Sequence, residues 1–93
     1  MMFDWPVIKL LLYIYENNGE VENFRGLMRE LEYSFAKLDR ARRILIKYGL
    51  IEEEVVKGAP QMLKLKITEK GIEVAKLILN ILEIMGLKPQ FIF

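Results

Sequence analysis

The stretch that most constrains this chain runs from Ser34 to Leu50, SFAKLDRARRILIKYGL, because it reads as one helix with a defined start and stop. Ser34 is a suitable N-cap, since its hydroxyl can accept a hydrogen bond from a free N–H of the first turn. Gly49 is a suitable stop, since glycine adopts the left-handed conformation that ends many helices. We therefore predict a helix over about residues 34–48.

This predicted helix has two faces of opposite character, because successive residues turn by about 100°. Its apolar face comprises Phe35, Leu38, Ala41, Leu45 and Tyr48. Its cationic face comprises Arg40, Arg43 and Lys47, with Ala36 beside them and Lys37 at the edge. A cationic helix of this length matches the major groove of DNA in size and in sign. The structural alternative is an ordinary solvated helix face.

The positive charge of the chain is concentrated in this one segment. The formal net charge of all 93 residues is only +1. Residues 1–33 sum to −3 and residues 34–48 sum to +4, whereas residues 49–68 and 69–93 each sum to zero. The distribution of charge, rather than its total, therefore favours a nucleic-acid partner.

The sequence contains no cysteine and no histidine. This excludes disulfides, thiolate or imidazole metal sites and histidine-based acid–base catalysis. It also has no glycine-rich phosphate loop and no recognisable nucleophile beside a base. We therefore expect a protein that is not an enzyme and that uses no cofactor and no metal.

The first residues, MMFDWPVIK, lack the basic start and the small-residue cleavage site of a secretory signal. No stretch reaches the roughly 18–20 uninterrupted apolar residues of a membrane span. We expect a cytoplasmic protein with no membrane partner. The chain is rich in Ile, Lys and Glu and poor in Asn and Gln, which is a bias of hyperthermophile proteins.

Two helices are predicted before the cationic one. The first covers about residues 5–17, with Asp4 as its cap and Pro6 in its first turn, and it carries few charges, so most of its sides should be covered. The second covers about residues 23–31, with Asn23 as a candidate cap. A very short link then leads into the cationic helix, which is a helix-turn-helix arrangement.

A β-hairpin and a long helix are predicted after the cationic helix. Alternating apolar and polar residues predict strands in the hairpin, which spans about residues 51–67. Thr68 is the expected cap of a helix over about residues 69–85. Apolar residues cover so much of this helix that a single small domain cannot bury them all, and the tail over residues 87–93 is apolar as well.

Two motifs give this order of elements a family resemblance. Residues 45–52, LIKYGLIE, resemble the end of a recognition helix passing into a wing, and residues 67–71, ITEKG, resemble the closure of that wing. Over about residues 5–85, the chain is similar to the winged helix-turn-helix domains of MarR, PadR and related archaeal regulators. The resemblance implies one mainly α domain over residues 1–93 with a small β-hairpin wing, in the order α-α-α-β-β-α. It also implies a transcriptional regulator that binds double-stranded DNA as a homodimer through its first and last helices.

Candidate site residues follow from the faces of these elements. The candidate DNA-binding residues are Ser34, Ala36, Lys37, Arg40, Arg43, Lys47, Arg25, Arg29 and Lys57. The candidate dimer residues are Trp5, Leu12, Ile78, Leu79, Leu82, Met85, Phe91 and Phe93. Several have a structural alternative: Ser34 as a cap only, and Arg25 and Arg29 as partners of nearby glutamates. Trp5, Tyr13 and Tyr15 could also wall an effector pocket, but packing is the stronger interpretation, so a small-molecule effector has no support.

Two features depart from the family pattern. The first strand of the wing contains Glu52-Glu53-Glu54, where a wing that touches DNA usually has basic residues. These glutamates are expected to pair with Lys57, Lys64 and Lys66 across the hairpin. Arg42 projects toward the apolar side of its helix, where the family normally has an aliphatic residue. The alternative functions are therefore a protein–protein adaptor and a chromatin-like protein that binds DNA with little sequence preference.

Overall fold

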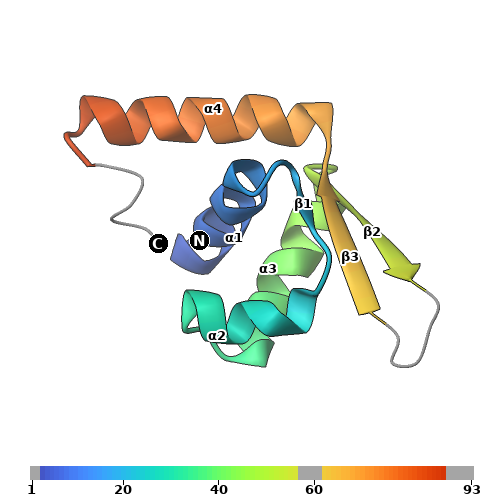
Figure 1. The fold of residues 1–93 in the computed structure, drawn as a ribbon. Helices are drawn as coiled ribbons and strands as arrows, with labels where there is room; N and C mark the ends of the chain where they lie inside the picture. Colours follow the sequence, from blue (N-terminus) through green and yellow to red (C-terminus); the bar gives the residue numbers. More distant parts are fainter. Residues whose placement is uncertain (1–2, 57–61, 88–93) are drawn as a thin grey trace.

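The computed structural model describes residues 3–56 and 62–87 of the chain. In chain order, the elements are α1 (Trp5–Glu16), β1 (Glu20–Val21), the 3-10 turn η1 (Phe24–Gly26), α2 (Leu27–Leu31), α3 (Phe35–Lys47), β2 (Ile51–Val56), β3 (Met62–Ile67) and α4 (Glu69–Ile84). In Figure 1, α4 crosses the top of the molecule above α1, while α2 and α3 lie below and the β2–β3 hairpin stands at one side. The predicted mainly helical fold with a hairpin wing is confirmed.

The sheet has one strand more than the sequence analysis predicted. Its order is β1-β3-β2, and both pairings are antiparallel. In β1, Glu20 lies opposite Lys66 and Val21 lies opposite Leu65. The N–H of Ile67 also donates to the carbonyl oxygen of Gly19 at 2.8 Å. A strand of two residues is too short to show alternation, so only its partner reveals it.

The core lies between α1, α3 and the sheet. Five residues of α1 are fully buried, which confirms that most sides of this helix are covered: Val7, Leu10, Leu11, Leu12 and Ile14. From α3, Leu38, Ala41 and Leu45 are fully buried against them. The buried face of α3 thus fixes which of its other residues face outward.

The caps of the helices divide into those that use side chains and those that do not. The Ser34 hydroxyl accepts a hydrogen bond from the Lys37 N–H at 3.3 Å, and Thr68 caps α4 in the same way, as predicted. Asp4 and Asn23 occupy the predicted N-cap positions of α1 and η1, but neither side chain makes a cap hydrogen bond. The Asp4 carboxylate instead binds an arginine of α3, and the segment after Asn23 begins as a 3-10 turn.

Within residues 3–56 and 62–87, no helix is both long and apolar enough to cross a bilayer.

Candidate nucleic-acid interface

The outer face of α3 gathers the cationic residues that the sequence analysis singled out. The following residues are all exposed: Ser34, Ala36, Lys37, Arg40, Arg43 and Lys47. They lie opposite the buried Leu38, Ala41 and Leu45, so the core holds this face toward solvent. The cationic side chains surround one small residue, Ala36, so a bound molecule could come close to the backbone of α3 at this point.

The apolar face of α3 is buried only in the middle. Phe35 is 45% exposed and Tyr48 is 38% exposed, so the two ends of the predicted apolar face are not buried. Both stand at helix ends, beyond the part that α1 covers. The Phe35 ring packs edge-on against Phe24, with 6.1 Å between ring centroids, and Lys47 Nζ lies 5.8 Å from the centroid of the Tyr48 ring.

Arg40 is tied to the start of α1. Its Nη1 donates to Asp4 Oδ2 at 2.7 Å, and the two side chains are 50% and 39% exposed. The other carboxylate oxygen, Oδ1, is buried and has no hydrogen-bond partner among the described residues. An exposed ion pair of this kind contributes about 0–1 kcal/mol, so another anion can replace Asp4.

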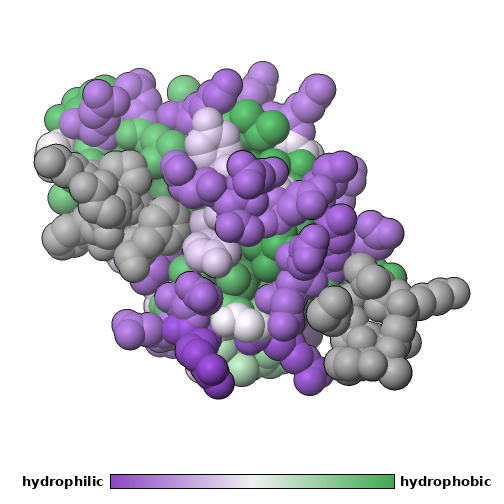
Figure 2. All heavy atoms as spheres, viewed as in Figure 1, coloured by the Kyte–Doolittle hydropathy of each residue, from purple (hydrophilic) through white to green (hydrophobic). Residues whose placement is uncertain are grey.

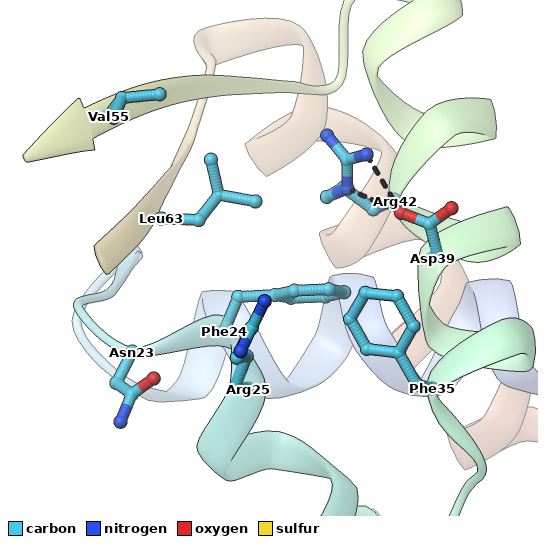
Figure 3. Close-up of a pocket in the computed structure, with 8 residues that line it drawn as sticks. All are labelled: Asn23, Phe24, Arg25, Phe35, Asp39, Arg42, Val55 and Leu63. Atoms are coloured by element: carbon cyan, nitrogen blue, oxygen red, sulfur yellow. Dashed lines mark hydrogen bonds and ion pairs between the residues drawn. The ribbon is translucent and has the colours of Figure 1, made fainter. Parts of the chain in front are cut away.

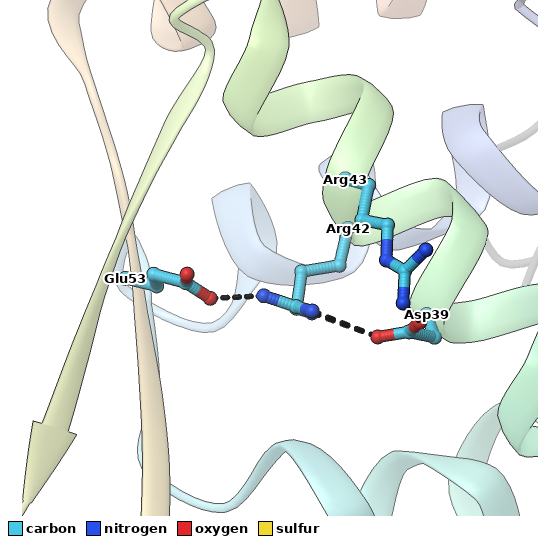
Figure 4. A network of polar contacts seen from close by, with 4 residues as sticks. All are labelled: Asp39, Arg42, Arg43 and Glu53. Atoms are coloured by element: carbon cyan, nitrogen blue, oxygen red, sulfur yellow. Dashed lines mark hydrogen bonds and ion pairs between the residues drawn. The ribbon is translucent and has the colours of Figure 1, made fainter.

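Four charged residues form a continuous series of contacts from the wing to the surface of α3, which we call the ion chain: Glu53, Arg42, Asp39 and Arg43 (Figure 4). Arg42 hydrogen-bonds to Glu53 Oε2 on one side. On the other side, its Nη2 and Nε bind Asp39 Oδ1 at 2.8 and 3.2 Å. Asp39 Oδ2 forms an ion pair with Arg43 Nη2 at 2.8 Å.

The ion chain explains why an arginine occupies the apolar side of α3. The Arg42 side chain is 16% exposed, and its guanidinium lies 5.8 Å from the centroid of the Phe24 ring. The hydrogen bond from Arg42 lowers the pKa of Asp39 below its ordinary value, and it outweighs the opposing effect of burial. Both charges of this pair are therefore present at neutral pH.

One glutamate of the acidic strand pairs differently from the prediction. Glu53 binds Arg42 of α3, as described above, and makes no ion pair with Lys64 or Lys66. Lys64 Nζ lies 3.6 Å from Glu20 Oε2 of β1, the strand that the sequence did not reveal. In the register of the sheet, Glu52 faces Lys66 and Glu54 faces Lys64. The candidate Lys57 lies outside the described residues.

Arg25 and Arg29 are exposed beside α3, and neither has an ion pair within 4 Å in the part of the chain that the structure describes. The alternative that glutamates neutralise them is therefore not observed. Arg25 also borders a pocket of about 220 Å³ between η1, α3 and the wing (Figure 3). Its lining comprises Asn23, Phe24, Arg25, Phe35, Asp39, Arg42, Val55 and Leu63.

The candidate dimer residues are only partly accessible. Trp5 and Met85 are 51% and 67% exposed, and Ile78 and Leu79 are half-buried. Leu12 is fully buried and Leu82 is 7% exposed, so their assignment to a dimer surface is wrong: both pack inside the protomer's own core. The last two candidates, Phe91 and Phe93, lie outside the described residues.

The exposed apolar residues of α4 form a stripe of which the sequence analysis singled out only Met85. We call it the α4 stripe, and it comprises Leu77, Ile81, Ile84 and Met85, which are 63%, 55%, 78% and 67% exposed. Figure 2 shows apolar surface at the upper left, over the C-terminal half of α4. The spacing of these residues is a helical repeat, but only the packing of α1 against α4 shows which side stays uncovered.

Two other expectations concern ligands. Tyr13 and Tyr15 are half-buried and pack against the core, and burial raises the pKa of Tyr13, as expected for packing residues. Among the described residues, no three His, Cys, Asp or Glu side chains are grouped so that they could hold a metal ion.

The structure resembles several solved proteins. It superposes on a transcriptional regulator homologue from Pyrococcus horikoshii OT3 with a TM-score of 0.74 and 22% identity, covering 85% of this chain and 77% of that one. It superposes on F-93 of SSV1 with a TM-score of 0.65 and 25% identity, covering 90% and 92%. For the transcriptional regulator YodB from B. subtilis, the TM-score is 0.64 and the identity 17%, covering 80% and 72%.

No protein-family model matches the sequence, and no curated protein matches it significantly. The helix-turn-helix of α2 and α3, the β2–β3 wing and these structural neighbours together show that the chain has the winged helix-turn-helix fold.

Proposed function

We propose that this protein is a DNA-binding transcriptional regulator that acts as a homodimer and inserts α3 into the major groove. The observation that carries the proposal is the exposed cationic face of α3 on a winged-helix scaffold. Two of these three structural neighbours are named as transcriptional regulators or their homologues, which supports the same function.

The contacts divide by chemistry. Arginine can bind guanine with two hydrogen bonds, so Arg40 and Arg43 are the candidate base readers. Ala36 is small enough to lie against a base edge or a thymine methyl group. The remaining cations are suited to phosphates, which set affinity and orientation rather than sequence preference: Lys37, Lys47, Arg25, Arg29 and, at the wing, Lys57.

The α4 stripe supports the homodimer. Four exposed apolar side chains along one side of a helix are costly in water, and a second copy of the same helix can cover them. A two-fold dimer would place two copies of α3 in successive major grooves, about 34 Å apart, on a palindromic site.

The deciding experiment is fluorescence anisotropy with labelled random-sequence duplex DNA at several salt concentrations. We expect binding that weakens steeply with salt, with a slope of about −0.9 per phosphate contacted. Replacing both Lys37 and Lys47, the candidate phosphate contacts on α3, by Ala should reduce this slope by about 1.8. The matched control replaces Lys70 and Lys76 by Ala, which removes two exposed charges from α4. This variant should keep the affinity for duplex DNA and the salt slope of the wild type.

A second candidate function is a protein–protein adaptor, which the α4 stripe and the acidic strand β2 also support. No binding of duplex DNA at about 50 mM salt, where phosphate attraction is strong, would reject the regulator and favour the adaptor. Binding without any preference in a sequence selection would favour instead a chromatin-like protein.

A further inference from the structure

Arg43 is held in a defined orientation although it lies at the surface. Its side chain is 74% exposed, yet Nη2 binds Asp39 Oδ2 at 2.8 Å. The remaining N–H groups of the guanidinium stay available for a base edge. By contrast, Arg40 binds Asp4, which precedes α1 and is itself 39% exposed.

The Asp39 carboxylate is itself held in place, because Arg42 hydrogen-bonds to its other oxygen, Oδ1. Oδ1 accepts two hydrogen bonds from Arg42, at 2.8 and 3.2 Å, and the Asp39 side chain is only 17% exposed. Each oxygen of the carboxylate therefore contacts a different arginine: Oδ1 contacts the largely buried Arg42, and Oδ2 contacts the exposed Arg43.

Arg42 is in turn fixed from the wing. It hydrogen-bonds to Glu53 of β2 and lies over the ring of Phe24. Figure 4 shows how the ion chain crosses from the wing to α3. An acidic residue that looks unsuited to a DNA-binding wing thus reaches the outer face of α3 through two intermediate side chains.

We propose that Asp39 is a positioning residue that orients Arg43 to read a guanine, and that Glu53 keeps Asp39 in place through Arg42. This inference rests on the proposed function. Immobilising a long side chain on binding costs free energy, and the ion chain meets this cost during folding. Bidentate recognition of guanine benefits in particular, because it requires a fixed plane for the guanidinium.

Orientation and simple electrostatics predict different results for Asp39→Asn. As a mere negative charge near DNA, Asp39 would weaken binding to every sequence equally, so the variant would bind all DNA more tightly. As a positioning residue, it favours one base over others, so the variant would lose discrimination at a single position of the site.

The test begins with selection of bound sequences from a random duplex library by the wild-type protein. The guanine in question is the position at which Arg43→Ala loses its preference. Asp39→Asn should reduce the discrimination between this guanine and adenine about two- to tenfold. Its binding to random duplex DNA should not weaken, since the variant has one negative charge fewer.

Two variants of β2 provide a matched pair. Glu53→Gln removes the charge at the wing end of the ion chain and should reduce the same discrimination, although less than Asp39→Asn does. Glu54→Gln removes an exposed charge from the next residue, outside the ion chain, and should leave discrimination unchanged. If Asp39→Asn is unfolded at the binding temperature, this pair decides the question.

Equal tightening of guanine and adenine sites by Asp39→Asn, or equal effects of Glu53→Gln and Glu54→Gln, would overturn the positioning role while the regulator function stands. A wild-type protein that binds DNA without selecting any sequence would also overturn it. No binding of duplex DNA at all would reject the regulator function and this inference together.

Discussion

Gly71 of α4 lies directly against the carbonyl oxygen of Leu50. A Cβ atom built on Gly71 would stand 2.0 Å from this oxygen, far inside the contact distance. The same junction holds two hydrogen bonds: the Thr68 hydroxyl donates to the Gly49 carbonyl oxygen at 2.6 Å, and the Thr68 N–H donates to the Leu50 carbonyl oxygen at 3.1 Å. The end of the cationic helix and the start of α4 are thus joined backbone to backbone.

Gly71→Ala should therefore destabilise the protein, although alanine favours helices by about 1 kcal/mol over glycine. The added methyl group would force the backbones apart, and overpacking of this kind costs about 1–3 kcal/mol. We expect a lower free energy of unfolding, measured by urea denaturation followed by circular dichroism.

The matched control is Gly26→Ala. A Cβ atom there meets only the Asn23 side chain, at 3.6 Å, which is an ordinary contact. This variant should be as stable as the wild type or slightly more stable, because alanine restricts the unfolded chain. An equal loss at both glycines would show that the close approach to Leu50 is unimportant.

This junction also explains why the sequence revealed the fold so readily. The motifs around Gly49 and Thr68 resemble a family pattern because each supplies a part of one contact: a helix stop, a cap and a glycine that lets two backbones meet. Such requirements are local, and therefore they can be read from residue types at fixed spacing.

Other features depend on partners far away in the sequence, and periodicity could not predict them. β1 exists because β3 offers it hydrogen bonds. The sequence shows that Arg42 is an unexpected charge on the apolar side of α3. It does not show that Glu53 is its partner, because the two residues meet only when the wing packs against α3. Likewise, Leu12 and Leu82 carry no sign in the sequence that one protomer alone buries them.

The low pKa of Asp39 predicts a pH dependence of stability. Because the folded protein binds this proton more weakly than the unfolded chain, whose ordinary value is 3.8, Asp39 stabilises the fold above about pH 4. That contribution is lost as the pH falls through the folded-state pKa. The difference in free energy of unfolding between wild type and Asp39→Asn should therefore shrink below about pH 4.

Urea denaturation of both proteins between about pH 7 and pH 2 measures this difference. Glu54→Gln is the control, since Glu54 is exposed and lies outside the ion chain. A difference between wild type and Asp39→Asn that stays constant over the whole range would show that the ion chain does not hold the ionised carboxylate.

Asp4→Asn should tighten the binding of duplex DNA about 1.4- to fivefold, because an exposed ion pair of about 0.2–1 kcal/mol no longer competes for Arg40. Asparagine suits the start of a helix as well as aspartate does, so the melting temperature should fall only by the small amount that the lost ion pair contributes. Anisotropy titrations at low salt measure the effect, which should fade as salt screens the pair.

Asp4→Asn in an Arg40→Ala background distinguishes two effects of Asp4 on DNA affinity: competition for Arg40 and general repulsion of the DNA phosphates. If Asp4 acts through Arg40, Asp4→Asn has no effect on affinity when Arg40 is absent. A similar gain in both backgrounds would mean that Asp4 merely repels the DNA backbone.

Replacing Leu77 and Ile81 by Glu should dissociate the proposed homodimer. Both side chains are more than half exposed in the protomer, so the substitution places two charges on the surface without disturbing the core. In a dimer that buries the α4 stripe, the same two charges would be desolvated without partners, which is strongly unfavourable. Light scattering at micromolar concentration should show the wild type at twice the 11.0 kDa protomer mass and the variant at a single protomer.

Lys76→Glu is the control, because it adds negative charge to an exposed position of α4 outside the stripe. It should remain a dimer. If DNA contacts come from two copies of α3, the dissociated variant should also bind a palindromic site more weakly while its melting curve still reports a folded protomer. A Leu77→Glu, Ile81→Glu variant that stays dimeric would move the interface away from the α4 stripe, and a wild type of protomer mass would reject the homodimer.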